Sequence, residues 1–165
     1  MNDAPIKNKR GFTFVEILLV IGLAALMVAV ISGSLLRLPT QADLEAEVQK
    51  VIADIKNQQL KSMVGETSGT EDAISYGIKF DMNSYTIFRG TGFTIGNTSN
   101  FTVSFPSSIQ ISSNTFPSGE IVFRRISGEV IGLVAGQDSI TLQNTISSAT
   151  STITINRYGA IIKNP

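Results

Sequence analysis

The sequence predicts an α+β fold, in which a long N-terminal helix packs on a domain built from an antiparallel β-sheet. Three observations predict it. Residues 17–36 form an apolar run of 20 residues without a charge. Apolar residues then recur at a three-four spacing over 44–55, which is typical of a helix with one buried face. From Ile74 onward apolar and polar residues alternate, which is the period of a half-buried strand.

The N-terminal segment begins with a basic leader. Three of its residues are basic and one, Asp3, is acidic; the basic residues are Lys7, Lys9 and Arg10. The apolar run beyond the leader would reach about 30 Å as a helix, which is the thickness of one bilayer core. Because basic flanks stay in the cytoplasm, we expect a cytoplasmic leader over 1–11, a transmembrane helix over 12–38 and a C-terminal domain across the membrane.

A second, amphipathic helix is expected over 39–64. Pro39 lacks an N–H and must interrupt or kink the helix before it, and Gly33 is a second expected kink. Thr40 is the expected cap of the new helix. The residues expected on its buried face are Leu44, Val48, Val51 and Ile55, with Ile52 and Met63 fitting the spacing less strictly.

Residues 65–165 are expected to form the β-rich globular domain, with about eight short strands. A polar loop over 65–73 leads into a strand from Ile74 to Phe80, a turn, and a strand from Tyr85 to Arg89. Further strands are expected around 101–105, 121–126, 130–134, 140–142, 153–155 and 160–163. Ser127-Gly128-Glu129 reads as a tight hairpin between two of these strands.

The composition excludes several kinds of chemistry. The chain has no cysteine and no histidine, so it has no disulfide, thiol nucleophile, histidine-based triad or usual zinc ligand set. Glu66, Glu71 and Asp72 match no calcium loop. We therefore expect no metal, no cofactor and no enzymatic activity. The net charge of zero indicates no dominant electrostatic partner such as nucleic acid.

One stretch carries a resemblance. Lys9-Arg10-Gly11-Phe12-Thr13-Phe14-Val15-Glu16, followed by the apolar run, resembles the class III signal of type IV prepilins and type II secretion pseudopilins. Farther on, the order of Tyr76-Gly77-Ile78, Tyr85-Thr86-Ile87-Phe88 and the later strands is similar to the minor pseudopilin H and fimbrial T group of minor pilins. The resemblance implies a structural minor pilin or pseudopilin of a type IV pilus or type II secretion-like filament.

The resemblance also implies roles for three residues. A prepilin peptidase would cleave between Gly11 and Phe12 and methylate the new Phe12 amine. Glu16 would neutralise the ammonium of a neighbouring subunit and so set the register of assembly. The implied partners are the peptidase, other pilin or pseudopilin subunits, the inner-membrane assembly platform and membrane lipid. The protein would reside in the bacterial inner membrane until it is extracted into the filament.

Three alternatives stay open. In the first alternative, Glu16 pairs with the Phe12 amine of its own chain, one helical turn away. In the second, the chain is a DNA-binding minor pilin for competence. Its candidate DNA-binding residues are Arg124, Arg125 and Arg157, with Arg89 and Lys163 as further contributors. On a strand, Arg124 and Arg125 would point to opposite faces. In the last alternative, an uncleaved single-pass anchor carries a β domain.

Overall fold

The computed structural model describes residues 12–35, 38–65 and 74–164 of the chain. The chain divides into two compact units, Met1–Leu38 and Pro39–Pro165. The expected leader over 1–11, including Gly11, lies outside the described residues. The same holds for Glu66, Glu71 and Asp72, which were considered as calcium ligands.

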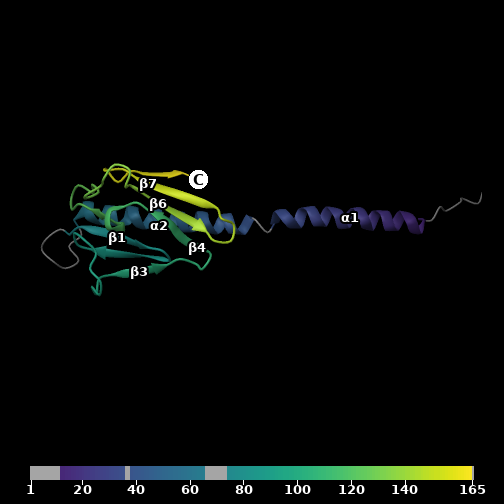
Figure 1. The fold of residues 1–165 in the computed structure, drawn as a ribbon, viewed down its shortest axis with the longest axis horizontal. Coiled ribbons are helices and arrows are strands. Elements are labelled where there is room, and N and C mark those ends of the chain that lie inside the picture. The colour runs from purple at the N-terminus through teal and green to yellow at the C-terminus, as the bar shows by residue number, and fades with distance from the viewer. Residues whose placement is uncertain (1–11, 36–37, 66–73, 165) are drawn as a thin grey trace, which may run out of the picture. The chain divides into compact units, whose positions relative to one another are not determined.

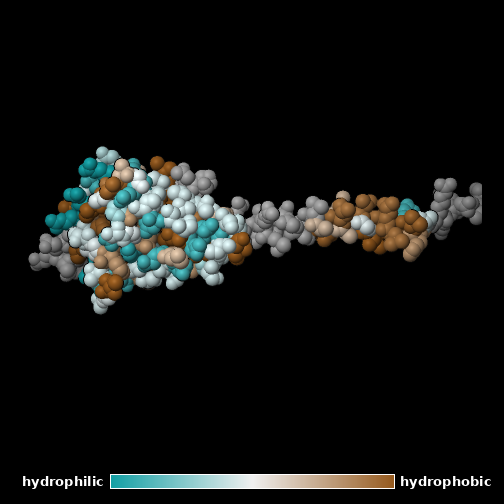
Figure 2. Space-filling model, viewed as in Figure 1, coloured by the Kyte–Doolittle hydropathy of each residue, from teal (hydrophilic) through white to brown (hydrophobic). Residues whose placement is uncertain are grey.

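Helix α1 is the main element that the structure describes in the first unit. It spans Phe14–Leu35, and hydrophobic side chains cover most of its coloured surface in Figure 2. Gly33 lies inside this helix, two residues before its end. Within the described part of the chain, no helix combines the length and the apolar character needed to cross a membrane. The expected transmembrane segment includes residues 36–37, which lie outside the described residues, so the membrane role stays a prediction.

Helix α2 spans Leu38–Val64, and all of it except Leu38 belongs to the second unit. Pro39 therefore lies in its first turn, where a residue without an N–H breaks no helical hydrogen bond. The prediction that Thr40 caps the helix was wrong, because the backbone is already helical from Leu38. The unit boundary falls between Leu38 and Pro39, at the place where the proline was expected to interrupt the helix.

The buried face of α2 follows the predicted spacing and extends beyond it. Leu44, Val48, Val51 and Ile55 are all buried, as predicted. The same three-four spacing continues through two buried polar residues, Gln58 and Ser62. Met63, by contrast, is 48% exposed, so its assignment to this face was wrong. The buried face is therefore apolar along its first half and polar near its C-terminal end.

Among the described residues, eight strands form two four-stranded antiparallel sheets, with the orders β3-β2-β1-β5 and β4-β6-β7-β8. Their bounds are β1 Tyr76–Asp81, β2 Ser84–Arg89, β3 Phe101–Ser104, β4 Ile109–Asn114, β5 Glu120–Phe123, β6 Ser139–Asn144, β7 Thr150–Ile155 and β8 Ile161–Asn164. Helix α2 lies along both sheets, and its apolar residues share one hydrophobic core with theirs (Figure 1). The α+β class is thus confirmed, with two sheets where one was expected.

Two strand predictions were wrong. Strand β4 was missed, because only Ile109 and Ile111 are apolar in it and a register shift interrupts its pairing with β6. Residues 130–134 do not form the predicted strand and make only isolated bridges, Phe123 with Val130 and Val134 with Gln137. The glycines at 132 and 136 have φ values of 69° and 78°, which suit turns and not extended backbone.

Candidate functional site

The start of α1 is built around a threonine. The backbone N–H of Glu16 donates to the backbone oxygen of Thr13 at 3.1 Å and to its Oγ1 at 3.3 Å. This is the geometry of an N-terminal helix cap, in which a hydroxyl accepts from an N–H that has no partner in the helix. The helix consequently begins at Phe14, and the expectation that it runs from Phe12 was wrong.

Phe12 and Glu16 lie on either side of this cap. Phe12 is 81% exposed, and Glu16 is exposed in the first helical turn. The Glu16 carboxylate makes no hydrogen bond or ion pair with any described residue, while the positive end of the helix dipole favours a negative charge at its position. Thr13-Phe14-Val15-Glu16 also matches the S/T-x-x-E capping box, a pattern that would have predicted the helix start from the sequence.

Arg124 and Arg125 lie in a turn after β5, so the prediction that they occupy opposite faces of a strand was wrong. The turn closes through two backbone hydrogen bonds, from Arg124 N to Glu129 O at 2.8 Å and from Gly128 N to Arg124 O at 2.9 Å. Ile126 and Gly128 adopt φ values of 72° and 68°, which end the extended backbone. Both arginines are exposed.

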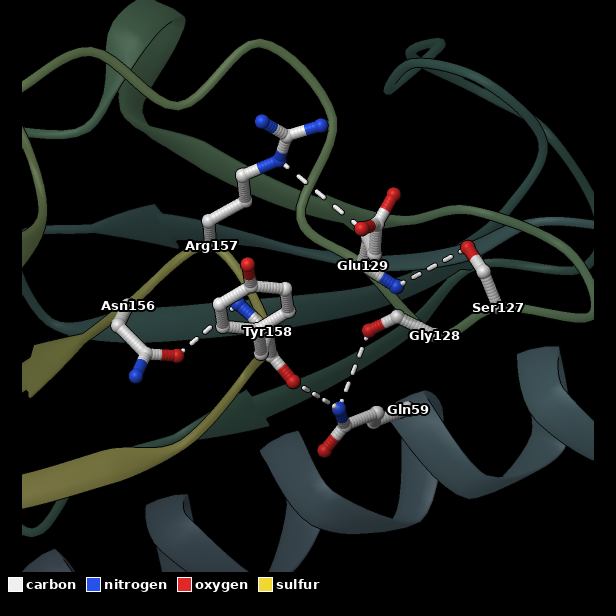
Figure 3. A network of polar contacts seen from close by, with 7 residues as sticks. All are labelled: Gln59, Ser127, Gly128, Glu129, Asn156, Arg157 and Tyr158. Atoms are coloured by element: carbon white, nitrogen blue, oxygen red, sulfur yellow. Dashed lines mark hydrogen bonds and ion pairs between the residues drawn. The ribbon is translucent and has the colours of Figure 1, made fainter.

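Arg157 lies in the turn between β7 and β8, next to the turn that carries the other two arginines. The backbone N–H of Val130 donates to Arg157 O at 2.9 Å, which holds the two turns together. The guanidinium of Arg157, however, faces Glu129, with Nε 3.9 Å from Oε1 (Figure 3). The pair is largely solvent-exposed and contributes little stability. Arg89 lies elsewhere, on β2, and Lys163 lies on β8.

Gln59 of α2 joins these two turns to the helix, as Figure 3 shows. Its Nε2 donates to Gly128 O at 3.1 Å and to Tyr158 O at 2.9 Å. Gly159 has a φ of 75°, and a Cβ built on it would lie 2.2 Å from Gln59 Nε2. Glycine therefore suits this position, since any larger residue would have to displace the Gln59 side chain. Nothing in the sequence marks Gln59, because a single glutamine on a helix carries no pattern.

Tyr85 and Asp54 form a polar contact between β2 and α2. The Tyr85 hydroxyl donates to Asp54 Oδ2 at 2.5 Å. Burial, and then the hydrogen bond to Asp54, raise the pKa of Tyr85 above its ordinary value near 10. A tyrosine held neutral in this way anchors the helix to the sheet. Within the described ranges, no group of acidic side chains is arranged to hold a metal ion.

The geometry thus offers two surfaces for contacts with other molecules. One is the exposed start of α1, and the other is the pair of neighbouring turns that carry Arg124, Arg125 and Arg157. Comparison with known proteins adds no relative: no protein-family model matches the chain, and neither does a curated protein or a solved structure.

Proposed function

We propose that this chain is a structural subunit, a minor pilin or pseudopilin, of a type IV pilus or type II secretion-like filament. The observation that carries the proposal is the stretch at 9–16, in which a basic pair, a glycine, a phenylalanine and a glutamate precede an apolar run. A prepilin peptidase would cleave after Gly11 and methylate Phe12. The exposed position of Phe12, just before the Thr13 cap, is compatible with its entry into a protease site.

Glu16 supplies the chemistry of assembly in this proposal. Its carboxylate lies in the first turn of α1, exposed and without an ionic partner among the described residues. A neighbouring subunit's N-terminal ammonium would satisfy it. In an apolar environment an unpaired charge is costly, so only the register that pairs the two charges would be stable.

We propose further that α1 and the residues around it hold the protein in the bacterial inner membrane before assembly. The support is that almost every described side chain of α1 is both apolar and exposed (Figure 2). An apolar helical surface of this kind requires lipid or other apolar helices to cover it. A filament subunit would contact lipid before assembly and the apolar helices of other subunits after it.

The substitution Glu16→Gln tests the proposal, because it removes the charge and keeps the shape and helix propensity. The variant is co-expressed with prepilin peptidase and pilin subunits. N-terminal mass spectrometry should show the same methylated Phe12 terminus as in the wild type. Crosslinking into filaments should fall at least about tenfold, since the loss of one partner from a desolvated charge pair costs about 3–5 kcal/mol.

The control is Glu45→Gln, the same chemical change at an exposed position of α2. This variant should be processed and incorporated as the wild type is. Normal incorporation of Glu16→Gln would remove the inter-subunit role of the carboxylate. A protein that keeps the uncleaved leader would favour the uncleaved anchor instead, and a mature terminus at any other residue would contradict cleavage after Gly11.

A further inference from the structure

A pocket of about 300 Å³ opens between the C-terminal half of α2 and the edge of the first sheet. Gln58 and Lys61 line it from the helix, Tyr76 from β1, Arg89 from β2 and Phe101 from β3. Ile87 and Arg89 share the face of β2 that carries Tyr85, so they point toward α2. Strand β3, which contributes Phe101 to the lining, is the edge strand of this sheet.

Gln58 is the most buried polar side chain in the lining of this pocket. The side chain is only 2% exposed, and its Oε1 is buried without a hydrogen-bond partner among the described residues. Buried polar atoms are nearly always paired, so one that is not indicates a missing partner. That partner must donate an N–H or an O–H.

The charge of the lining is positive. Arg89 makes no ion pair with any described residue, and Lys61 Nζ lies 5.8 Å from the centre of the Tyr76 ring. No described aspartate or glutamate lines the pocket. Asp54, one turn before Gln58 on α2, already accepts the Tyr85 hydroxyl. A bound anion would therefore meet the Arg89 guanidinium without competition from a carboxylate among the described lining residues.

The rim adds an apolar surface. Phe101 is 64% exposed, and it belongs to β3, which pairs only with β2 among the described strands. The outer edge of β3 is thus open to an extended chain. An occupant of this pocket has an anionic group for Arg89, a donor for Gln58 and an apolar group for Phe101.

We propose that the pocket binds an acidic peptide segment of a partner protein. An aspartate or glutamate residue places a carboxylate and a backbone N–H within a few bonds of each other. This combination matches a pocket that is lined by both Arg89 and Gln58. A neighbouring apolar side chain then covers Phe101. A nucleic-acid backbone fits less well, because a phosphodiester carries acceptors only and leaves Gln58 without a donor.

The test uses the full-length chain, labelled with ¹⁵N, in a zwitterionic detergent. It is titrated with the blocked dipeptide acetyl-Asp-Phe-amide and, separately, with its neutral analogue acetyl-Asn-Phe-amide. The acidic peptide should shift the side-chain amide of Gln58 and the signals of Arg89, with a Kd on the order of 1 mM. The neutral analogue should bind at least about tenfold more weakly, because it lacks the charge-assisted contact.

Two variants and one control locate the binding. Arg89→Gln should weaken binding at least about tenfold. Gln58→Leu should also weaken binding while leaving the melting temperature unchanged or raising it, since it removes a buried unpaired acceptor. The control Arg157→Gln removes a cation outside the pocket and should bind as the wild type does.

The outcomes divide clearly. Equal binding of the acidic and neutral peptides, or shifts away from the pocket, would overturn the proposal. So would the absence of shifts at a peptide concentration of about 10 mM. A single-stranded oligothymidylate that displaces the peptide from the same residues would make this a nucleic-acid site instead. The assay needs no filament, so its result is independent of the proposed assembly function.

Discussion

At the scale of single residues, Ile126 combines a β-branched side chain with a left-handed backbone, at a φ of 72°. Its N–H donates to Ser62 O at 2.8 Å, which fixes the turn against the end of α2. The side chain itself is 71% exposed and contributes little to the core. The backbone hydrogen bond to Ser62 therefore holds the turn in a conformation that isoleucine disfavours.

Ile126→Asn should raise the free energy of unfolding by about 1 kcal/mol, because asparagine tolerates this conformation and little apolar burial is lost. Urea unfolding of the chain in a mild detergent, followed by the strand signal in circular dichroism, measures it. Ile146→Asn is the control: Ile146 is 73% exposed in a turn and has no positive φ. Its stability should stay within about 0.5 kcal/mol of the wild type. An equal gain in both variants would mean that strain at Ile126 is not the cause.

At the scale of elements, the contacts between α2 and the two turns depend on Gln59 and on the glycine beside it. Gly159→Ala forces Gln59 to leave one or both of its carbonyl partners. Gly136 offers a matched comparison, because its φ is 78° and a Cβ there meets nothing within 4 Å. The two positions therefore share the backbone penalty and differ in the contact with the helix.

Gly136→Ala should cost about 1 kcal/mol from the left-handed backbone alone. Gly159→Ala should cost about 1–2 kcal/mol more, because it also loses net hydrogen bonding to Gln59. Urea midpoints of the two variants measure the difference. In a Gln59→Ala background that difference should largely disappear. If it persists there, the clash acts on some residue other than Gln59.

The buried Tyr85 and its contact with Asp54 make the free energy of unfolding depend on pH in the alkaline range. The folded state raises the pKa of Tyr85, so above about pH 10 the folded chain holds a proton that the unfolded chain has lost. Stability is then complete below about pH 10 and falls as the pH rises beyond it, by up to about 1.4 kcal/mol per pH unit.

Tyr85→Phe should remove this alkaline loss and should lower stability at pH 7 by about 1.5–3 kcal/mol, since Asp54 loses a hydrogen bond to a charged group. The control is Tyr158→Phe, because Tyr158 is 71% exposed. Urea unfolding at pH 7 and at several pH values above 10 compares the variants. An unchanged alkaline slope in Tyr85→Phe would assign the pH dependence to other groups.

At the scale of the whole molecule, local sequence patterns predicted the individual helices and strands better than they predicted which strands pair with each other. Alternation predicted β1 and β2, and the three-four spacing predicted α2, because one face of each is buried and apolar. Residues 130–134 misled the same reasoning, since apolar side chains there lie in a glycine-rich loop. Strand order depends on contacts between distant residues, which no local period records.

The residues of the candidate sites likewise differ in how far the sequence could predict them. Thr13 and Glu16 form a recognisable capping pattern, so the start of α1 was predictable from the sequence. Gln58 was not, because its burial depends on β1, β2 and β3 closing over a polar position of α2. The turns of Arg124 and Arg157 also meet only in the folded chain. Contacts of this kind become visible only once the strands are placed.

The second unit should fold without the first. Residues 39–165 contain the whole core shared by α2 and both sheets, and they form one compact unit. This fragment should be soluble and should melt cooperatively, with mixed helix and strand in its circular dichroism spectrum. Aggregation, or a melt without a transition, would show that the domain requires α1 or a partner subunit.

The strand order has a consequence for how the domain reaches its native state. Strands β1, β2 and β3 form a local meander, and so do β6, β7 and β8, but β4 and β5 each join the sheet built mainly from the other half of the chain. Neither sheet is complete until β4 has joined the second meander and β5 the first. Pairing of β5 with β1 must also close a long loop, and such non-local pairing slows folding. We expect refolding to show early formation of two hairpin-rich halves, followed by a slower step in which both sheets are completed together.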